Sequence, residues 1–352
     1  MSLSAAAAPG TRAVSERHRF DLSALTRWLE ARIPGFSGPA QVLQFSGGQS
    51  NPTFLIEASG AQYVLRKKPP GKLIGSAHAI DREYRVLSAL QGSAVPVPGL
   101  HCYCDDESII GTPFYVMEYL AGRIFTDPLL PGLDAAQRAA IYDAMNDALA
   151  RLHTVDWRGL GLGDFGKPEQ FIARQLALWT RQYESARTET VNAMDQLRCW
   201  LAENIPSDDQ ACIAHGDYRL GNLIFHPTEP RLLALLDWEL STIGHPMSDL
   251  AFNCMTYYLP AGHPISSGLV SADLQALGIP GEQAYLDAYA RRSGRDPMKH
   301  WSFYMAFSLY RTAAIQHGVY ARSLAGNASS STAHLFNESY QLVADAGLRL
   351  ID

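Results

Sequence analysis

The chain has 352 residues, of which 47% are hydrophobic and 18% charged, and its formal net charge is −6. This is the composition of an ordinary globular protein, long enough for two domains or for one domain with two lobes, and it excludes a largely disordered chain. The acidic balance, without any block of basic residues, argues against nucleic acid as the main partner.

The N-terminal segment contains a short Ala run followed by Pro9, Gly10 and charged residues. It lacks the apolar core of a signal peptide, and no run reaches the roughly 18 to 20 apolar residues of a membrane span. The five cysteines include no CxxC pair, so we expect reduced thiols. These features predict a cytoplasmic protein without a membrane partner and with a flexible N-terminus over residues 1–19.

The first structured part, residues 20–120, is predicted to be rich in strands. Asp21 is a suitable N-cap for a helix over residues 22–33, which Pro34 and Gly35 end. A second helix is expected over residues 77–90. Alternating apolar residues bounded by glycine turns and prolines indicate five strands. They are expected at residues 41–45, 53–58, 62–67, 100–104 and 114–120.

After Gly122 the periodicity becomes helical. Long helices are predicted over residues 134–153, over 168–203 with room for a break, and over 301–320. Residues 211–240 are predicted to form short strands and loops. The sequence therefore indicates an α+β protein, with a strand-rich nucleotide-binding lobe over residues 20–120 and a helical catalytic and substrate lobe over residues 121–352.

The most informative stretch runs from His215 to Asn222, on a short loop that contains glycine. Asp217 precedes Asn222 by five residues, and the next apolar run ends in Asp237. Phosphoryl transfer from ATP needs a carboxylate that orients and deprotonates a hydroxyl, with an amide oxygen and a second carboxylate that hold magnesium. We therefore predict Asp217 as the catalytic base and Asn222 and Asp237 as magnesium ligands. Arg219 is placed to neutralise the transferring phosphate oxygens.

Candidate nucleotide-binding residues precede this stretch. Arg66 on the third strand is a candidate cation for the α- and β-phosphates, and Glu83 on the following helix is expected to hold it. Each alone is more simply a surface charge, and the interpretation depends on their order behind a glycine turn. Free backbone N–H groups of that turn can face phosphate oxygens. The turn residues are Gly47, Gly48, Gln49, Ser50 and Asn51.

Glu118, Tyr119 and Leu120 lie at the end of the fifth predicted strand, where the chain passes from one lobe to the other. Their backbone groups are candidates for contacts with the adenine edge. A simple connector between lobes is the alternative, and both interpretations can hold together. His215 is expected to fix the catalytic loop by hydrogen bonds, and Asp249 to anchor that loop.

Several of these phrases resemble the aminoglycoside phosphotransferase-like family, which includes choline kinase-like proteins and is related to protein kinases. The resemblance covers about residues 40–320. It implies a protein kinase-like two-lobe fold, with a small antiparallel five-stranded N-lobe, one helix and a larger helical C-lobe. It also implies ATP, Mg²⁺ and transfer to a hydroxyl. The phrases that carry it are 45–51, 215–222, 235–239 and 248–251.

Within the family, the chain looks most like a subgroup that is fused to acyl-CoA dehydrogenases in animals and separate in bacteria. The phrases that carry this likeness are 64–69, 161–166 and 310–322. The subgroup implies a small-molecule acceptor that is a hydroxylated acyl group, such as a 4-hydroxyacyl-CoA, in place of an antibiotic. It also implies a functional link to an acyl-CoA dehydrogenase.

The chain departs from the family pattern at two positions. Arg66 replaces the usual strand lysine, with Lys67 and Lys68 beside it, and arginine and lysine are not interchangeable at a geometric site. Either Arg66 performs the role or a neighbouring lysine reaches in. Asp237 is followed by Trp238 and Glu239, so Glu239 is a candidate extra carboxylate near the metal or substrate.

Candidate acceptor residues lie on two helices. Arg311 and Gln316 belong to the aromatic-rich helix over 301–320, and Arg174 and Trp179 to the earlier one. Core packing is the simpler interpretation of the aromatic stripe.

Two alternatives to a small-molecule kinase are weighed. A catalytically weak or inactive kinase-fold module that binds a nucleotide or acyl group is favoured only by Arg66. A protein kinase is disfavoured, because the usual activation segment after Asp237 is absent.

Overall fold

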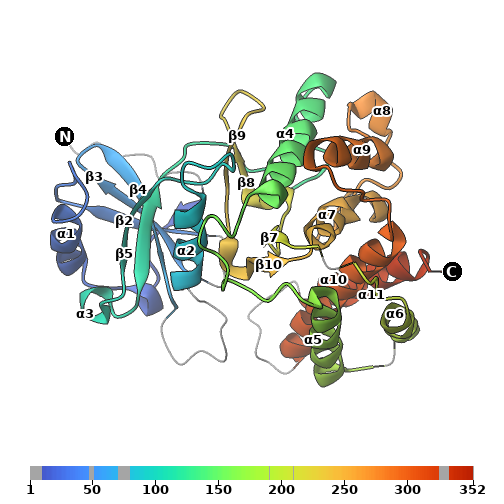
Figure 1. The fold of residues 1–352 in the computed structure, drawn as a ribbon. Helices are drawn as coiled ribbons and strands as arrows, with labels where there is room; N and C mark the ends of the chain where they lie inside the picture. Colours follow the sequence, from blue (N-terminus) through green and yellow to red (C-terminus); the bar gives the residue numbers. More distant parts are fainter. Residues whose placement is uncertain are drawn as a thin grey trace. The chain divides into compact units, whose positions relative to one another are not determined.

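The computed structural model describes residues 10–46, 51–69, 80–189, 191–208, 210–324 and 333–351. The chain folds into two compact units. Unit 1 comprises Met1–Gly122 together with Leu233–Glu239, and unit 2 comprises Arg123–Leu232 together with Leu240–Asp352. Figure 1 follows the chain through both units in colours that run along the sequence. Unit 1 is built on an antiparallel sheet and unit 2 is mostly helical, which confirms the predicted α+β class.

The sheet of unit 1 has six strands in the order β1-β2-β3-β4-β6-β5, and every neighbouring pair is antiparallel. All five predicted strands are present, and β1 is an addition. A strand of two residues is too short to produce an alternating pattern, so it could not be predicted from alternation. The strands are β1 (Thr11–Arg12), β2 (Gln41–Phe45), β3 (Thr53–Ala58), β4 (Ala61–Lys67), β5 (Leu100–Cys104) and β6 (Phe114–Glu118).

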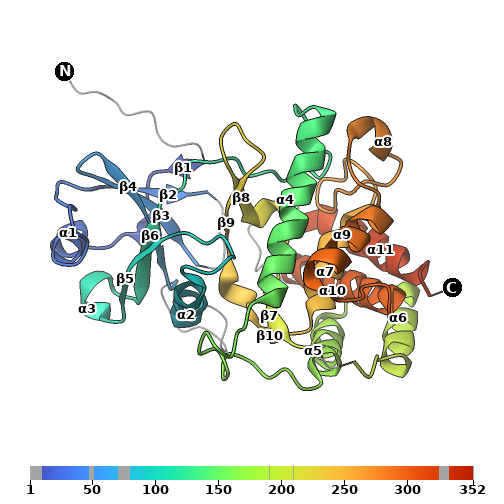
Figure 2. The same ribbon diagram turned by 45° about the horizontal axis from the view of Figure 1, so that its top comes forward.

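Helix α1 (Leu22–Glu30) covers one face of this sheet, as Figure 2 shows. The Asp21 side chain accepts a hydrogen bond from the N–H of Ala24, which confirms the predicted N-cap. Leu25 and Leu29 of α1 are fully buried in a core with residues of the sheet. The described parts of unit 1 also contain α2 (Ile80–Leu90) and the short α3 (Glu107–Ile110).

Alternate residues of β4 point to opposite faces of the sheet. Leu65 belongs to the core beneath α1, so its neighbour Arg66 points to the other face, where it meets Glu83 of α2. The alternation along β4 therefore decides which of its charged residues can take part in the candidate site.

The long helix α10 (Trp301–Leu324) packs against α5, α6, α7 and α11 in unit 2. The predicted helix over 168–203 is interrupted and forms α5 and α6. None of the helices in the described ranges is long and apolar enough to cross a membrane. The other helices are α4 (Ala135–Thr154), α5 (Phe171–Ala186), α6 (Asn192–Glu203), α7 (Pro246–Cys254), α8 (Leu274–Leu277), α9 (Glu282–Ser293) and α11 (Ala333–Leu348).

The stretch over residues 211–240 consists of short strands and loops, as predicted. Strand β7 (Cys212–Ala214) pairs antiparallel with β10 (Thr242–Gly244) in unit 2. The loop after β7 carries Asp217 and ends in a 3-10 turn, Leu220–Asn222, which leads into β8 (Leu223–Phe225). Strand β9 (Leu232–Leu235) brings the chain back into unit 1, a return that the sequence analysis did not predict.

Candidate active site

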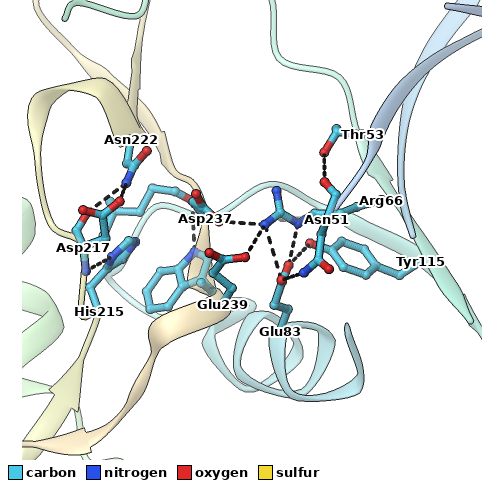
Figure 3. Close-up of polar contacts among 12 residues, drawn as sticks. Asn51, Thr53, Arg66, Glu83, Tyr115, His215, Asp217, Asn222, Asp237 and Glu239 are labelled. Carbon is cyan, nitrogen blue, oxygen red and sulfur yellow. Dashed lines mark hydrogen bonds and ion pairs between the residues drawn. The ribbon is translucent and has the colours of Figure 1, made fainter. Parts of the chain in front are cut away.

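A buried cation lies at the centre of the charged cluster in unit 1. Nη2 of Arg66 lies 3.3 Å from Oε1 of Glu83, and Nε lies 2.7 Å from Oε2, at ion-pair distance but outside hydrogen-bond geometry. The same Nη2 lies 2.6 Å from Oδ1 of Asp237 and 3.8 Å from Oε2 of Glu239 (Figure 3). The structure thus brings Arg66 and Glu83 together as the sequence predicts. It also pairs Arg66 directly with Asp237, which was not predicted.

Glu83 is the most deeply buried acid of this cluster, with 1% of its side chain exposed. Besides Arg66, it accepts hydrogen bonds from Nδ2 of Asn51 and, at 3.1 Å, from Oη of Tyr115. A buried charge is tolerated when it is paired and hydrogen-bonded, as here. Asn51, a predicted phosphate contact, therefore also supports Glu83. The other predicted turn residues, Gly47, Gly48, Gln49 and Ser50, lie outside the described residues.

Lys67 does not take the place of Arg66. The Lys67 side chain points to the face opposite Arg66, and its ammonium lies 5.8 Å from the centre of the Phe20 ring. Burial lowers the pKa of Lys67. Burial alone would also lower the pKa of Arg66, but the charges of Glu83 and Asp237 outweigh it and raise that pKa above its usual value. Arg66 therefore lies beside Glu83, as its predicted role requires.

Asp237 has an unusual backbone. Its φ is +66°, in the left-handed region that residues other than glycine seldom adopt. The residue follows the buried β9 and leaves 30% of its side chain exposed. Non-glycine residues in such conformations cluster at functional sites. The predicted metal ligand therefore combines a constrained backbone with an accessible carboxylate.

The predicted adenine contacts lie at the end of strand β6 and just beyond it. The N–H of Glu118 donates to the carbonyl of Gly99 at 2.7 Å, and the Glu118 carboxylate accepts from the Gly99 N–H at 3.2 Å. Its backbone donor is therefore already used inside unit 1. Tyr119 and Leu120 lie beyond the end of β6, outside regular secondary structure. The prediction of a backbone donor for adenine now depends on these two residues.

The predicted catalytic loop of unit 2 brings Arg219 and Asn222 to the carboxylate of Asp217. Oδ2 of Asp217 accepts hydrogen bonds from Nδ2 of Asn222 at 2.8 Å and from Nε of Arg219 at 3.3 Å. Nδ2 of Asn222 also donates to the carbonyl of Asp217 at 2.8 Å, which closes the loop on itself (Figure 3). With the amide nitrogen so used, the amide oxygen Oδ1 of Asn222 is the atom left for a cation. Asp217 keeps 24% of its side chain exposed.

Asp249 on α7 anchors this loop, as predicted. It is buried, and its two oxygens accept from the N–H groups of His215 at 2.6 Å and Gly216 at 2.9 Å. Nε2 of His153 lies 3.3 Å from Oδ2 of Asp249. Burial would raise the pKa of Asp249, but the hydrogen bonds from His153 and Gly216 outweigh it and lower that pKa. Burial lowers the pKa of His153, so a neutral imidazole supports an ionised Asp249.

Gly216 is held from both sides. Its φ is +84°, and a Cβ at this position would lie 2.6 Å from the carbonyl oxygen of Leu240, so only glycine fits. Its own carbonyl accepts from Nη2 of Arg311 at 2.7 Å. The Arg311 guanidinium lies over the rings of Trp179 and Phe252, at 5.4 and 5.3 Å from their centres. Arg311 and Trp179 were predicted to face the acceptor, whereas Nη2 of Arg311 donates to the loop that carries Asp217.

A cavity of about 580 Å³ lies within unit 2 beside the catalytic stretch. Arg219 and Gln316 belong to its wall, and Nε2 of Gln316 donates to Oγ of Ser266 at 2.8 Å. Arg174 and Trp179 are not among its lining residues. Arg174 is exposed and donates to the carbonyl of Lys167. Apolar side chains form much of the wall, among them Tyr142, Met145, Leu220, Phe252, Met255 and Leu259.

A two-unit fold with these acidic loops agrees with the family resemblance that the sequence indicated. Residues 41–298 match the model of the phosphotransferase enzyme family, and the chain belongs to this family.

Two curated relatives are similar over nearly the whole chain. Mouse acyl-CoA dehydrogenase family member 10 is 49% identical over 326 residues, which are 92% of this chain and 30% of the mouse protein. Rat acyl-CoA dehydrogenase family member 11 is 45% identical over 344 residues, 96% of this chain and 44% of the rat protein. The chain therefore spans less than half the length of these relatives.

Solved structures share the fold. A Ralstonia eutropha protein, described as a candidate aminoglycoside phosphotransferase, has a TM-score of 0.87 and 46% identity, and the match covers 94% of this chain and 98% of that one. An aminoglycoside phosphotransferase in complex with ADP and hygromycin B has a TM-score of 0.58 and 16% identity, with 93% and 98% covered. The second likeness shows the fold alone.

Proposed function

We propose that the chain is an ATP- and Mg²⁺-dependent phosphotransferase that moves the γ-phosphate to a hydroxyl of a small molecule. The observation that carries this proposal is the catalytic loop. Asp217 receives hydrogen bonds from Asn222 and Arg219, while the buried Asp249 holds the loop backbone. Such a loop keeps one accessible carboxylate in a fixed direction, as hydroxyl activation requires.

Asp217 would act as the base. Its Oδ2 is occupied by Asn222 and Arg219, so Oδ1 is the oxygen that can accept the proton of a substrate hydroxyl. A positioned base of this kind contributes typically about 10²- to 10⁴-fold to the rate. Arg219, with 54% of its side chain exposed, can turn from Asp217 toward phosphate oxygens. The reaction would then join the acceptor oxygen to the γ-phosphorus and release ADP.

The donor set suits magnesium. Mg²⁺ prefers hard oxygen ligands and usually keeps several waters and substrate phosphate oxygens, so it needs only one or two protein ligands. No group of three acidic, His or Cys side chains that could cage a metal occurs in the described ranges, which agrees with that mode of binding. Asn222 and Asp237 would hold the ion. When bound, the ion would neutralise charge on the β- and γ-phosphates.

Arg66 is the candidate cation for the nucleotide phosphates. Its recorded pairs within the described residues use Nε and Nη2, which leaves Nη1 for a phosphate oxygen. Backbone groups of Tyr119 and Leu120 would meet the adenine edge. The ADP in the solved aminoglycoside phosphotransferase of similar fold supports a nucleotide for this chain.

The cavity in unit 2 supports a hydroxylated acyl group or hydroxy acid, as its CoA ester or free, as the acceptor. Among the described residues that line it, Asp127 is the only carboxylate, and its Oδ1 already accepts from the N–H of Leu129 at 2.9 Å. An amino sugar with several cations would find few partners on such walls. The names of the mouse and rat relatives support a functional link to an acyl-CoA dehydrogenase.

One observation favours a catalytically weak or inactive nucleotide-binding module instead. Nη2 of Arg66 lies 2.6 Å from Oδ1 of Asp237, the oxygen that a metal would need. A guanidinium that kept this position would exclude the ion. The enzyme is preferred because Asn222 holds the Asp217 carboxylate by a hydrogen bond, an arrangement that a binding module does not need.

A screen for ADP release separates the two functions. The purified chain is incubated with ATP and Mg²⁺ and, one at a time, hydroxy acids, their CoA esters, amino sugars and choline-like alcohols. An enzyme releases ADP with at least one acceptor, and EDTA abolishes the release. Binding of ATP with no ADP release for any compound would favour the module.

A further inference from the structure

The peptide group between Gly216 and Asp217 is fixed at both ends. Its carbonyl, that of Gly216, accepts from Nη2 of Arg311 at 2.7 Å, and its N–H, that of Asp217, points to Nδ1 of His215 at 3.3 Å. A peptide group is planar, so holding both ends fixes the plane from which the Asp217 side chain departs. The direction of the carboxylate is therefore coupled to Arg311.

Arg311 is itself immobilised by packing. Its side chain comes from α10 and lies against Trp179 of α5 and Phe252 of α7, with cation–π distances of 5.4 and 5.3 Å. Its Nε is buried without a hydrogen-bond partner among the described residues. Burying a donor without a partner is unfavourable, so other contacts must offset the burial of Nε. The hydrogen bond from Nη2 to the carbonyl of Gly216 is such a contact.

The other hydrogen bonds of the loop hold different peptide groups. Asp249 accepts from the N–H groups of His215 and Gly216, which fixes the peptide planes before Gly216. Asn222 donates to the carbonyl after Asp217. The carbonyl between them, that of Gly216, is held by Arg311.

We propose that Arg311 is a positioning residue for the Asp217 base, acting through the carbonyl of Gly216. This inference rests on the proposed function, because it assigns Arg311 to the chemical step in place of the acceptor contact that its helix suggested. Loss of the guanidinium should then lower kcat and leave the KM for ATP nearly unchanged. It should also loosen the loop over residues 215–219.

Hydrogen–deuterium exchange of peptides that cover this loop tests the proposal without any substrate. Arg311→Ala should exchange about tenfold faster there, as expected when one charge-assisted hydrogen bond is lost. Arg123→Ala is the matched control. Arg123 also donates to backbone carbonyls, those of His226 and Glu229, and packs on Phe125, and, within the described parts of the chain, no hydrogen bond or ion pair joins it to residues 215–219. Unchanged loop exchange in Arg311→Ala, or equal change in both variants, would overturn the proposal.

Kinetics sharpen the same test. Turnover is measured with 4-hydroxybutyryl-CoA as the acceptor, or as transfer of the phosphate to water if no compound of the screen is phosphorylated. Arg311→Ala should have an about hundredfold lower kcat, because a catalytic group is then misplaced. Guanidinium chloride at a non-denaturing concentration should restore part of that rate, and Arg123→Ala should keep it. A rise in the acceptor KM alone would contradict the proposal and favour a substrate contact. If the wild type never releases ADP, the proposed function fails while loop exchange still decides the role of Arg311.

Discussion

The two charged regions of the molecule hold their candidate functional carboxylates in different ways. In unit 1, a buried cation pairs with acidic side chains, and Asp237 is held by Nη2 of Arg66 at 2.6 Å. In unit 2, a buried acid holds the backbone, and the N–H of Gly216 lies 2.9 Å from Asp249. A side chain held by an ion pair can exchange its partner for a metal or a phosphate. A side chain placed by its backbone keeps its direction when ligands enter or leave.

The largest effect is expected where unit 1 depends on a single charge. Arg66→Met would leave Glu83 buried without its counter-ion, and removing one partner of a buried pair costs about 3 to 5 kcal/mol. The free energy of unfolding, measured by urea titration, should fall by about 3 kcal/mol. Arg66→Lys keeps the cation and should lose less. A loss below about 1 kcal/mol for Arg66→Met would mean that charge pairing does not hold this region.

Gly216→Ala tests the backbone support of unit 2. A Cβ there would lie 2.6 Å from the carbonyl oxygen of Leu240, at a φ of +84°. The left-handed conformation alone costs roughly 1 to 2 kcal/mol, so we expect about 2 kcal/mol less stability and a sharp loss of turnover. Gly221→Ala is the control, because its Cβ would meet only the flexible end of Arg219. Equal stability of the two variants would contradict the account.

His153 should make the stability of unit 2 depend on pH. Burial lowers its pKa, so below its usual value near 6.5 the unfolded chain binds a proton that the folded chain does not. Stability should therefore fall as the pH drops from 7 toward 5. The pKa values of His18, His101 and His317 are also lowered, so the comparison must be with His153→Gln. The slope should be smaller in this variant by up to about 1.4 kcal/mol per pH unit. Identical slopes would show that His153 does not titrate as inferred.

The smallest effect on stability is expected at Arg219. Its pair with Asp217 at 3.3 Å is exposed, and such pairs contribute roughly 0 to 1 kcal/mol. Arg219→Ala should unfold like the wild type in urea, yet phosphorylate an acceptor about tenfold more slowly, because a cation near the transferring phosphate is lost. A clear loss of stability with normal turnover would make Arg219 a structural residue.

Short-range sequence patterns were enough to predict most of the fold. The five predicted strands, the Asp21 cap and the interrupted helix over 168–203 follow from alternation, capping and periodicity within short windows. Asp217 and Asn222 are close in sequence, so their meeting could be predicted. The two-residue β1 had no such signal.

Contacts between distant parts of the chain were not predictable in this way. Arg66 and Asp237 are 171 residues apart, and Arg311 and Gly216 are 95 apart. Such pairs depend on how the strands and helices pack, and the periodicity of a short stretch of sequence does not report that packing. Arg311 was a candidate for the acceptor pocket, although an arginine on an aromatic-rich helix can instead have its charge held by a partner within the protein.

The most direct test of the central claim compares the wild type with Asp217→Asn, using the acceptor from the screen and ³¹P NMR to follow the phosphorylated product. The substitution keeps the size of the side chain and removes the base. We expect Asp217→Asn to bind ATP and Mg²⁺ as the wild type does, and to form product about a thousandfold more slowly. Product formation within tenfold of the wild type would contradict the assignment of Asp217 as the base and, with it, the proposed mechanism.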